Sequence, residues 1–374
     1  MKYYIIAGEA SGDLHGSNLI KALKQVDVQT DVRCWGGDLM QQQGATLVRH
    51  YRELAFMGFV EVIANLRTIF SNIDFCKKDI EQFQPDALVL IDYPGFNLRI
   101  AEWAHQKNMK VIYYISPQVW AWKESRVHKI KKVVDKMFVI LPFEKEFYKK
   151  FDYDVDFVGH PLIDAIENFK ADVQDDFIKS NNLSDKKIIA LLPGSRKQEV
   201  STMLPLMISA AKSFTDFQFV IGGAPSIAPD FYKEFISGTD TKIVYNQSYL
   251  LLKHASAALV TSGTATLETA LFSVPEVVCY KGNTISYHIA RQLIKVKYIS
   301  LVNLIMNREV VKELIQSELN ETNIKNELSK IINDKEHISK LQKDYTELKQ
   351  VLGGTGASLK TAKGIVEYLK ETIS

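Results

Sequence analysis

Two short loops of the chain place glycine and hydroxyl residues where an apolar run gives way to a helical pattern. One is Leu191-Leu192-Pro193-Gly194-Ser195-Arg196, and the other is Thr261-Ser262-Gly263-Thr264-Ala265-Thr266-Leu267-Glu268. A helix N-terminus presents unpaired N–H groups and the positive end of a dipole, so it attracts phosphate, and glycine lets the backbone come close. The two loops together predict a nucleotide-diphosphate site.

This predicted site combines backbone amides with a few side chains. Arg196 supplies a rigid fork of donors that suits phosphate oxygens. Each loop has an ordinary alternative, because Arg196 could be a surface ion-pair residue and the second loop a plain N-cap reinforced by Glu268. The residues expected to bind the nucleotide are Gly194, Ser195, Arg196, Ser262, Gly263, Thr264, Thr266 and Glu268.

An aspartate follows the apolar run 87–91 and stands at the carboxyl end of a predicted strand. A carboxylate at this position, Asp92, is well placed to accept a proton from an attacking hydroxyl. The alternative is a turn former before Pro94-Gly95. Asn97 could orient a substrate or cap the next helix.

A glycine-bounded loop, 8–16, separates the first apolar run from a helical pattern. Its glycines allow close backbone approach, and Glu9, Asp13 and His15 add polar groups, so the loop can face a ligand across a crevice. The alternative is a simple helix start that Asp13 caps. The residues expected at this acceptor side of the crevice are Glu9, Ser11, Gly12, Asp13, Asn97, Ser116 and Gln118.

Aromatic and apolar residues suggest contacts with sugars or lipids. Trp120 and Trp122, in the loop after the run 111–115, could stack on sugar rings or acyl chains, or be buried structural residues. Large apolar residues recur at helical spacing from 56 to 75, which fits a core helix, a lipid groove or a helix on a bilayer surface. The predicted lipid groove comprises Phe56, Phe59, Val60, Ile63, Leu66 and Phe70.

Two further patterns have structural explanations. Alternating aspartates at 152–156 could hold Mg²⁺ or Mn²⁺, but we favour a solvated connection because the segment lies far from both phosphate loops in sequence. The glycine cluster 353–356 follows a helix rather than a strand, so we predict a turn rather than a dinucleotide site.

Length and composition limit the architecture that positions these residues. A chain of 374 residues, 46% hydrophobic and 24% charged, favours two globular domains, and a net charge of +2 gives no argument for nucleic-acid binding. Cys34, Cys76 and Cys279 lie far apart, as is usual in a reducing cytoplasm. No apolar run suits a signal peptide or a spanning helix, so any membrane contact should come from the surface.

Apolar runs alternate with helical patterns along the chain, which predicts two doubly wound α/β units with parallel sheets that bind ligand at the carboxyl ends of their strands. Because the pattern weakens between 159 and 187, we expect domains 1–165 and 166–352 and a last helical segment 353–374. The expected strands are 3–7, 87–91, 111–115, 137–141, 188–192, 217–221, 242–245, 257–260 and 276–280.

In this order, the motifs resemble those of the lipid-A-disaccharide synthases, a family of cytoplasmic glycosyltransferases with the two-domain GT-B fold. The resemblance extends over nearly the whole chain. The motifs that carry it are GEASGD at 8–13, MGFVEV at 57–62, IDYPGFN at 91–97, SPQVWAW at 116–122, PFE at 142–144, FVGHPL at 157–162, LLPGSR at 191–196 and SGTATLE at 262–268.

The resemblance implies two Rossmann-like domains facing a central crevice, with the last helix packed back on the first domain. It implies transfer of 2,3-diacylglucosamine from its UDP derivative to 2,3-diacylglucosamine 1-phosphate, which inverts the anomeric carbon and releases UDP. In this scheme Asp92 is the base, with Asp13, Glu9 or His15 as the alternatives. Arg196 and the two phosphate loops stabilise the leaving diphosphate, Glu268 binds the ribose, and neither a metal nor a cofactor is needed.

The same resemblance implies lipid substrates, peripheral attachment to the inner membrane and no nucleic-acid partner, and it is compatible with a homodimer. The chain departs from the family pattern at Val302 and at 312–314, which leaves the roles of Asn303 and Gln316 open. Two other functions remain alternatives: a UDP-sugar 2-epimerase of the same architecture, or a non-catalytic module that binds a nucleotide or a lipid.

Overall fold

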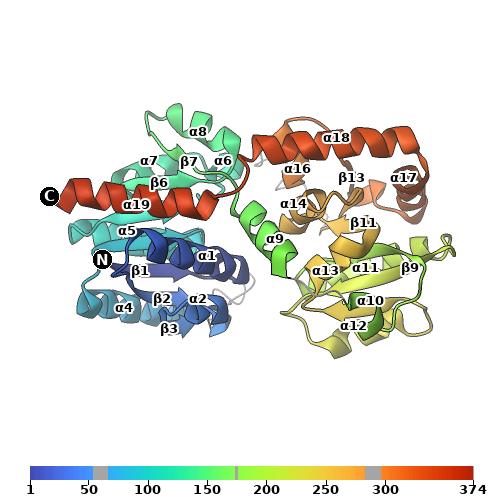
Figure 1. Ribbon diagram of the computed structural model, residues 1–374, viewed down its shortest axis with the longest axis horizontal. Coiled ribbons are helices and arrows are strands. Elements are labelled where there is room, and N and C mark those ends of the chain that lie inside the picture. The colour runs from blue at the N-terminus through green and yellow to red at the C-terminus, as the bar shows by residue number, and fades with distance from the viewer. Residues whose placement is uncertain (54–65, 173–175, 283–295, 374) are drawn as a thin grey trace. The chain divides into compact units, whose positions relative to one another are not determined.

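The computed structural model describes residues 1–53, 66–172, 176–282 and 296–373. The chain forms two compact units. Unit 1 comprises Met1–Ala165 and Leu352–Ser374, and unit 2 comprises Ile166–Val351. Both units are α/β, and the ribbon diagram labels their elements (Figure 1).

Unit 1 contains a seven-stranded parallel sheet with the order β3-β2-β1-β4-β5-β6-β7. The order reverses between β1 and β4, and such a switch point is where doubly wound sheets usually bind ligands. The strands are β1 (Lys2–Ala7), β2 (Asp31–Gly36), β3 (Thr46–His50), β4 (Ala87–Ile91), β5 (Val111–Tyr114), β6 (Lys136–Val139) and β7 (Asp156–Phe157).

Helices connect these strands and cover the sheet. The C-terminal helix α19 lies beside α1, although the two are far apart in sequence (Figure 1). The helices are α1 (Ala10–Val26), α2 (Asp38–Gln42), α4 (Leu66–Phe83), α5 (Pro94–Gln106), α6 (Val119–Trp122), α7 (Arg126–Val133), α8 (Pro142–Lys149) and α19 (Ala357–Ile373), with a 3-10 turn, η1, at Tyr51–Glu53. Helix α9 (Pro161–Asp172) crosses the boundary between the units.

The start of α19 is fixed by a carboxylate from α9. Asp164 accepts hydrogen bonds from the backbone N–H groups of Gly356 at 2.6 Å and Ser358 at 3.1 Å, which caps the helix. Gly353, Gly354 and Gly356 all have positive φ angles of 86°, 67° and 93°. The interpretation of this glycine cluster as a turn is therefore confirmed.

Unit 2 contains a six-stranded parallel sheet with the order β10-β9-β8-β11-β12-β13. Its strands are β8 (Lys187–Leu192), β9 (Phe217–Gly223), β10 (Lys242–Tyr245), β11 (Ala255–Thr261), β12 (Glu276–Tyr280) and β13 (Lys312–Ile315). Its helices are α10 (Phe177–Ser180), α11 (Lys197–Ala211), α12 (Pro229–Ile236), α13 (Ser248–His254), α14 (Thr264–Leu271), α16 (Leu301–Met306), α17 (Glu321–Asn333) and α18 (Lys335–Val351), with a 3-10 turn, η2, at Gln316–Glu318.

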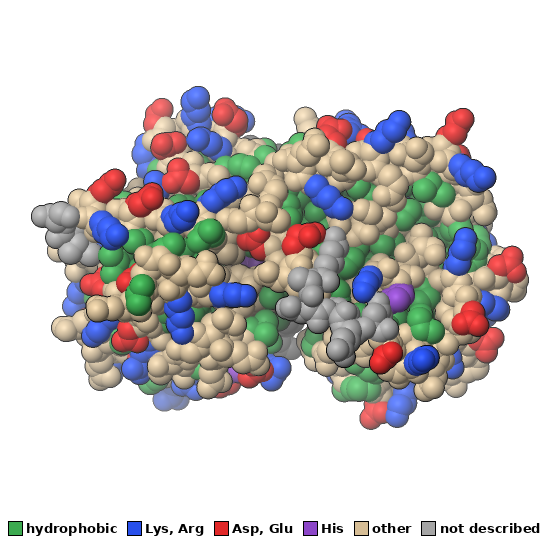
Figure 2. Space-filling view, in the orientation of Figure 1, with side chains coloured by type: hydrophobic (Ala, Val, Ile, Leu, Met, Phe, Trp, Pro, Cys, Tyr) green, Lys and Arg blue, Asp and Glu red, His purple; other side chains and the backbone are tan. Residues whose placement is uncertain are grey.

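The predicted fold class is confirmed, because both sheets are parallel and doubly wound. The central strand β4 is apolar along its whole length, and all five of its residues are buried, as expected where helices cover both faces of a sheet. No helix in the described part of the chain is both long and apolar enough to cross a membrane. On the face shown in Figure 2, positive and negative side chains are interspersed.

Among the described residues of unit 2, the buried carboxyl group of Glu276 has no hydrogen-bond partner. Glu276 opens β12, is 1% exposed, and has neither side-chain oxygen paired. Burial raises the pKa of Glu276 well above its usual range. The folded state therefore holds a proton that the unfolded chain releases above about pH 4.3, so this group makes unit 2 less stable as the pH rises through that range and beyond.

We expect Glu276→Gln to stabilise unit 2 by about 1–3 kcal/mol at pH 8, because the amide carries no proton to lose. Urea unfolding at pH 5 and pH 8 measures the effect, and the gain should be smaller at pH 5. Glu309→Gln is the control, since Glu309 makes only an exposed ion pair with Lys312 at 3.7 Å. Equal gains at both pH values would contradict a buried neutral Glu276.

Candidate active site

Asp92 stands at the carboxyl end of β4, where the chain turns sharply into α5. Asp92 and Tyr93 both have positive φ angles, of 43° and 48°. The backbone carbonyl of Asp92 accepts hydrogen bonds from Asn97 Nδ2 at 2.8 Å and from the Tyr113 hydroxyl at 2.5 Å. These two bonds hold a conformation that a non-glycine residue rarely adopts, a feature that often accompanies function.

The carboxyl group of Asp92 is a weaker acid than that of an exposed aspartate. Burial, and to a lesser extent the carboxylate of Glu9, raises the pKa of Asp92 to about 6. Gly8, the neighbour of Glu9, packs directly against the ring of Tyr93, the neighbour of Asp92. A Cβ atom at Gly8 would lie 2.4 Å from that ring, so only glycine allows this close approach of the two loops. Asp92 is thus a stronger base than an exposed aspartate and is still ionised at neutral pH.

Some residues around the start of α1 are exposed, and others are buried and hydrogen-bonded within unit 1. Glu9 and Ser11 are exposed, so both are available to a ligand. Asp13 is buried, and its carboxylate accepts hydrogen bonds from the N–H groups of Gly37, Leu39 and Met40 at 2.8, 3.1 and 3.0 Å. Asp13 therefore fixes the start of α2, which corrects its assignment to the crevice and weakens it as an alternative base.

Three other residues assigned to the acceptor side are also buried. Gly12 packs against Ala7, whose Cβ would lie 3.0 Å from a Cβ at position 12. Asn97 is 0% exposed and donates to the carbonyls of Ile91 and Asp92. Ser116 is buried and bonded to the Tyr148 hydroxyl at 2.6 Å. The side chains of Asn97 and Ser116 are thus engaged within unit 1, whereas Gln118 is exposed.

Two histidines are buried in unit 1. Burial lowers the pKa of His15 to about 4, and burial together with His15 lowers the pKa of His160 to about 3. His160 Nδ1 accepts a hydrogen bond from the Leu162 N–H at 3.2 Å. Both imidazoles are neutral at pH 7. His15 is inaccessible, which makes it a weak candidate for the base.

Glu144 is a buried carboxyl that was not predicted to be a site residue. It accepts hydrogen bonds from the backbone N–H groups of Ile140 and Leu141 at 3.2 and 2.9 Å and so caps α8. Burial raises its pKa to about 7. Trp120 is buried nearby and packs edge-on against Phe143 at 4.9 Å, so this tryptophan is structural.

In unit 2, the first phosphate loop is held by a glutamate of α11. The backbone N–H groups of Ser195 and Arg196 donate to Glu199 Oε2 at 3.0 and 3.2 Å, and Arg196 Nη1 lies 3.2 Å from Glu199 Oε1. Gly194 has a φ of 108°, and a side chain there would collide with Glu199. The amides predicted to meet phosphate thus already have an anionic partner, although the Arg196 side chain is 66% exposed.

Glu199 was not predicted as part of this site, because the prediction was based on Gly194, Ser195 and Arg196. Its position three residues after Arg196 is the spacing of a capping box, and that spacing predicts a carboxylate folded back on the loop.

The second phosphate loop leads from β11 into α14. The hydroxyl of Ser262 donates to the Ile299 carbonyl at 2.8 Å, and that of Thr266 donates to the Gly263 carbonyl at 2.8 Å. Thr266 is fully buried, whereas Gly263 and Thr264 are exposed. The first N–H groups of a helix have no acceptor within it, so they are the donors this loop offers. Ser262 and Thr266 were predicted to bind the nucleotide, and because their hydroxyl protons are directed at backbone carbonyls, this prediction depends on the backbone N–H groups of the loop.

Glu268 lies one helical turn after Thr264 and is half-buried. Its Oε1 accepts a hydrogen bond from the Tyr249 hydroxyl at 3.2 Å, and burial raises its pKa. The second carboxylate oxygen is left for another donor, such as a sugar hydroxyl.

Most of the predicted lipid groove lies outside the described residues, namely Phe56, Phe59, Val60 and Ile63. Leu66 begins α4. On the same helix, Phe70 and Phe75 are 53% and 42% exposed, whereas Ile73 is buried. The described part of α4 therefore presents large aromatic side chains at its surface.

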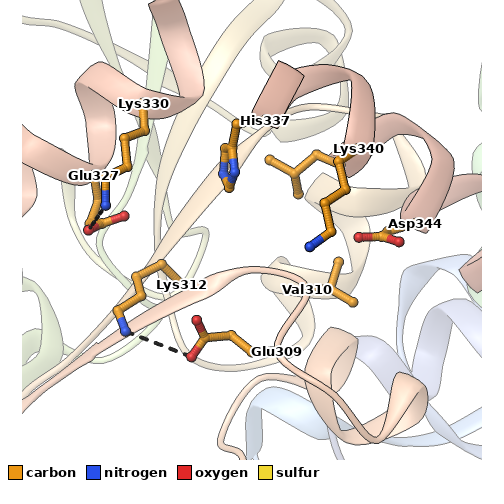
Figure 3. A pocket seen from close by; sticks show the side chains of 9 residues that line it. Glu309, Val310, Lys312, Glu327, Lys330, His337, Lys340 and Asp344 are labelled. Atoms are coloured by element: carbon orange, nitrogen blue, oxygen red, sulfur yellow. Dashed lines mark hydrogen bonds and ion pairs between the residues drawn. The ribbon is translucent and has the colours of Figure 1, made fainter. Parts of the chain in front are cut away.

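The aspartate-rich segment 152–156 makes ordinary surface contacts. Asp156 pairs with Lys136 at 2.6 Å. A polar cavity of about 280 Å³ lies elsewhere, between β13, α17 and α18 of unit 2 (Figure 3). Its charges balance, because Glu309 and Glu327 already pair with Lys312 and Lys330, and its lining includes no residue of the phosphate loops.

Two parallel-sheet units with loops at the carboxyl ends of their strands define a GT-B type of fold, and solved structures agree. A UDP-GlcNAc 2-epimerase from Neisseria meningitidis, solved with UDP-GlcNAc, is 16% identical and gives a TM-score of 0.68 over 99% of this chain and all of its own. CalG4, the calicheamicin glycosyltransferase, is 14% identical and gives 0.60 over 100% of this chain and 99% of its own.

The sequence identifies the group more narrowly. The family model for lipid-A-disaccharide synthetase matches residues 3–364. The lipid-A-disaccharide synthase of Syntrophus aciditrophicus is 38% identical, and that of Geobacter sulfurreducens is 34% identical. The alignments cover 98% of both proteins in the first case, and 99% of this chain and 97% of the relative in the second. The chain therefore belongs to the lipid-A-disaccharide synthase family of glycosyltransferases.

Proposed function

We propose that this protein transfers 2,3-diacylglucosamine from its UDP derivative to the 6-hydroxyl of 2,3-diacylglucosamine 1-phosphate. The products are the β-1,6-linked disaccharide 1-phosphate of lipid A biosynthesis and UDP. Family membership supports this reaction over a 2-epimerase, because the epimerase structures share only the fold at 12–16% identity. The single observation that carries the chemistry is the position of Asp92 directly after β4, at the switch point of the unit 1 sheet, and the raised pKa of its carboxyl group is consistent with that role.

Asp92 acts as the general base in this proposal. The acceptor hydroxyl attacks the anomeric carbon from the face opposite UDP, the C–O bond to UDP breaks, and the hydroxyl proton passes to Asp92. Asn97 and Tyr113 position Asp92 through its backbone carbonyl, so neither of these side chains occupies the carboxylate. The exposed side chains of Glu9, Ser11 and Gln118 are proposed to contact the acceptor.

Unit 2 is proposed to hold the leaving group. Arg196 exchanges its partner Glu199 for the diphosphate, and the first N–H groups of α14, with Gly263 and Thr264, bind phosphate oxygens. Glu268 accepts a hydrogen bond from the ribose. Fixed donors of this kind stabilise the negative charge that develops on UDP, so the proposed reaction requires no metal.

We further propose that the protein works at the cytoplasmic face of the inner membrane, where both lipid substrates reside. The exposed rings of Phe70 and Phe75 support a surface contact rather than insertion. A homodimer is part of the same proposal, and sedimentation equilibrium of the full chain tests it.

The choice of substrate tests the proposed function. UDP release should be fast from UDP-2,3-diacylglucosamine in the presence of the acceptor lipid and negligible from soluble UDP-N-acetylglucosamine. Turnover of the soluble sugar alone would contradict the assignment and favour the epimerase alternative.

The pH dependence of the reaction reports on Asp92. We expect kcat/KM to fall on the acid side with an apparent pKa of about 6, because protonated Asp92 cannot accept the proton. Glu9→Gln should move this acid limb to lower pH, because it removes a nearby negative charge that raises the pKa of Asp92. Initial rates between pH 5 and pH 8 measure both effects.

Glu102→Gln serves as the control for this shift, because Glu102 is exposed and pairs with Lys129 at 2.7 Å. An acid limb that stays in place in Glu9→Gln, or moves equally in Glu102→Gln, would count against the coupling of Glu9 with Asp92.

A further inference from the structure

Glu313 is a buried carboxylate on β13 that is surrounded by donors from the segment before the strand. The Ile299 N–H donates to its two oxygens at 3.2 and 3.1 Å, and the N–H and hydroxyl of Ser300 donate to Oε1 at 2.9 and 2.8 Å. Asn303 Nδ2 donates at 2.9 Å. A buried charge is costly unless hydrogen bonds compensate it, and these bonds make Glu313 a fixed anchor.

Asn303 extends this anchor to the loop between α16 and β13. Its Oδ1 accepts hydrogen bonds from the N–H groups of Val310 and Val311 at 2.7 and 3.0 Å. The Ser300 hydroxyl oxygen also accepts from the Asn303 N–H and caps α16. Glu313, the Ile299–Ser300 turn and the start of α16 are thus joined by buried hydrogen bonds.

The Ile299–Ser300 turn is also bonded to the second phosphate loop. The Ile299 carbonyl accepts the hydrogen bond of the Ser262 hydroxyl at 2.8 Å, and the Ser262 N–H donates to the Cys279 carbonyl of β12 at 3.2 Å. Ser262 directly precedes Gly263, the N-cap residue of α14. A continuous path of contacts therefore runs from Glu313 through Ile299 and Ser262 to the N-terminus of α14.

We propose that Glu313 is a positioning residue for donor binding: it holds the Ile299–Ser300 turn against Ser262 and thereby sets the start of α14. This inference rests on the proposed role of that helix start in binding the diphosphate. Amide donors bind an anion well only when their geometry is set before the ligand arrives. Ser262 fastens the loop in this arrangement, and its hydroxyl proton is directed at Ile299 rather than at the ligand.

The chemistry of the site defines which substitutions break the anchor. Glu313→Gln keeps the size of the side chain but turns one acceptor oxygen into an NH₂ group that faces N–H donors. Glu313→Asp keeps both acceptors and the charge but retracts them by one methylene, so it should restore part of the function. Ser262→Ala removes the link between the turn and the phosphate loop without touching Glu313.

A double-mutant cycle on UDP binding, measured by calorimetry with the full chain, tests the proposal. Glu313→Gln and Ser262→Ala are each expected to raise the Kd for UDP about tenfold. The double variant should bind no more weakly than the weaker single variant, because both changes break the same path. Glu309→Gln, just before β13, is the matched control and should leave the Kd unchanged. Glu313→Asp should bind UDP more tightly than Glu313→Gln.

The possible results separate the inference from the proposed function. A Glu313→Gln protein that melts earlier but binds UDP normally, or effects that multiply in the double variant, would overturn the positioning role. If Glu313→Gln does not fold, Ser300→Ala replaces it in the cycle, since it removes only one of the donors to Glu313. Failure of the unsubstituted protein to bind UDP would instead overturn the proposed donor site, and the inference with it.

Discussion

Asp92→Asn is expected to lower kcat about 10³-fold while the Kd for UDP stays within about threefold of its original value. The amide is nearly isosteric with the carboxylate but cannot take the proton of the attacking hydroxyl. The backbone bonds from Asn97 and Tyr113 end on the carbonyl of residue 92, so the substitution should leave the turn intact. Steady-state rates with both lipid substrates and calorimetry with UDP measure the two quantities.

Asp86→Asn is the matched control for this change, because Asp86 precedes the same strand at its opposite end and is exposed. Its carboxylate only accepts a hydrogen bond from the Lys2 N–H at 2.7 Å. A near-normal rate in Asp92→Asn would contradict the proposal and make Glu9 the strongest remaining candidate for the base.

Arg196→Ala is expected to weaken UDP binding about 30-fold and to lower kcat as well. A charge-assisted contact with phosphate contributes about 2 kcal/mol, and its loss also removes positive charge from the side of the leaving group. Because Arg196 pairs with Glu199, its removal also leaves that carboxylate without its cation. The loss of the Arg196 charge and the unpaired carboxylate of Glu199 both disfavour binding of the diphosphate.

Two variants separate these contributions. Lys197→Ala removes the neighbouring positive charge, which lies over the Phe231 ring, and should change UDP binding by less than about threefold. Glu199→Gln keeps Arg196 and removes the competing charge. If Arg196→Ala and Lys197→Ala weaken binding equally, the effect of Arg196 is one of general charge and not of a specific contact.

The buried strands could be predicted from the sequence because each is a run of apolar residues. β4, β10 and β12 begin and end at the predicted residues. β2, β3, β7 and β13 were not predicted. In β2 and β13, charged residues interrupt the apolar pattern, namely Asp31, Arg33, Lys312 and Glu313. Arg33 is compensated by Asp79 at 2.5 Å, and Glu313 by the donors of the Ile299–Ser300 turn. Partners that distant in sequence cannot be found by periodicity.

The same limit applies to the candidate site. The position of Asp92 follows from its strand. The hydrogen bonds of Asp13 to the start of α2 and the burial of Asn97 depend on tertiary contacts, which the sequence does not show. Polar residues within a motif look alike in sequence whether they face a ligand or hold a loop. In this chain Asp13, Asn97 and Ser262 hold backbone groups, whereas Glu9 and Arg196 remain exposed.

The linkage of the disaccharide product is the most direct test of the proposed reaction. We would incubate the purified chain with UDP-2,3-diacylglucosamine and 2,3-diacylglucosamine 1-phosphate in detergent micelles and follow the anomeric proton by NMR. The proposed mechanism predicts a β-1,6-linked disaccharide in equal amount to the UDP released, and the loss of this product in Asp92→Asn. An α-linked product, an epimerised donor, or undiminished disaccharide formation by Asp92→Asn would contradict it.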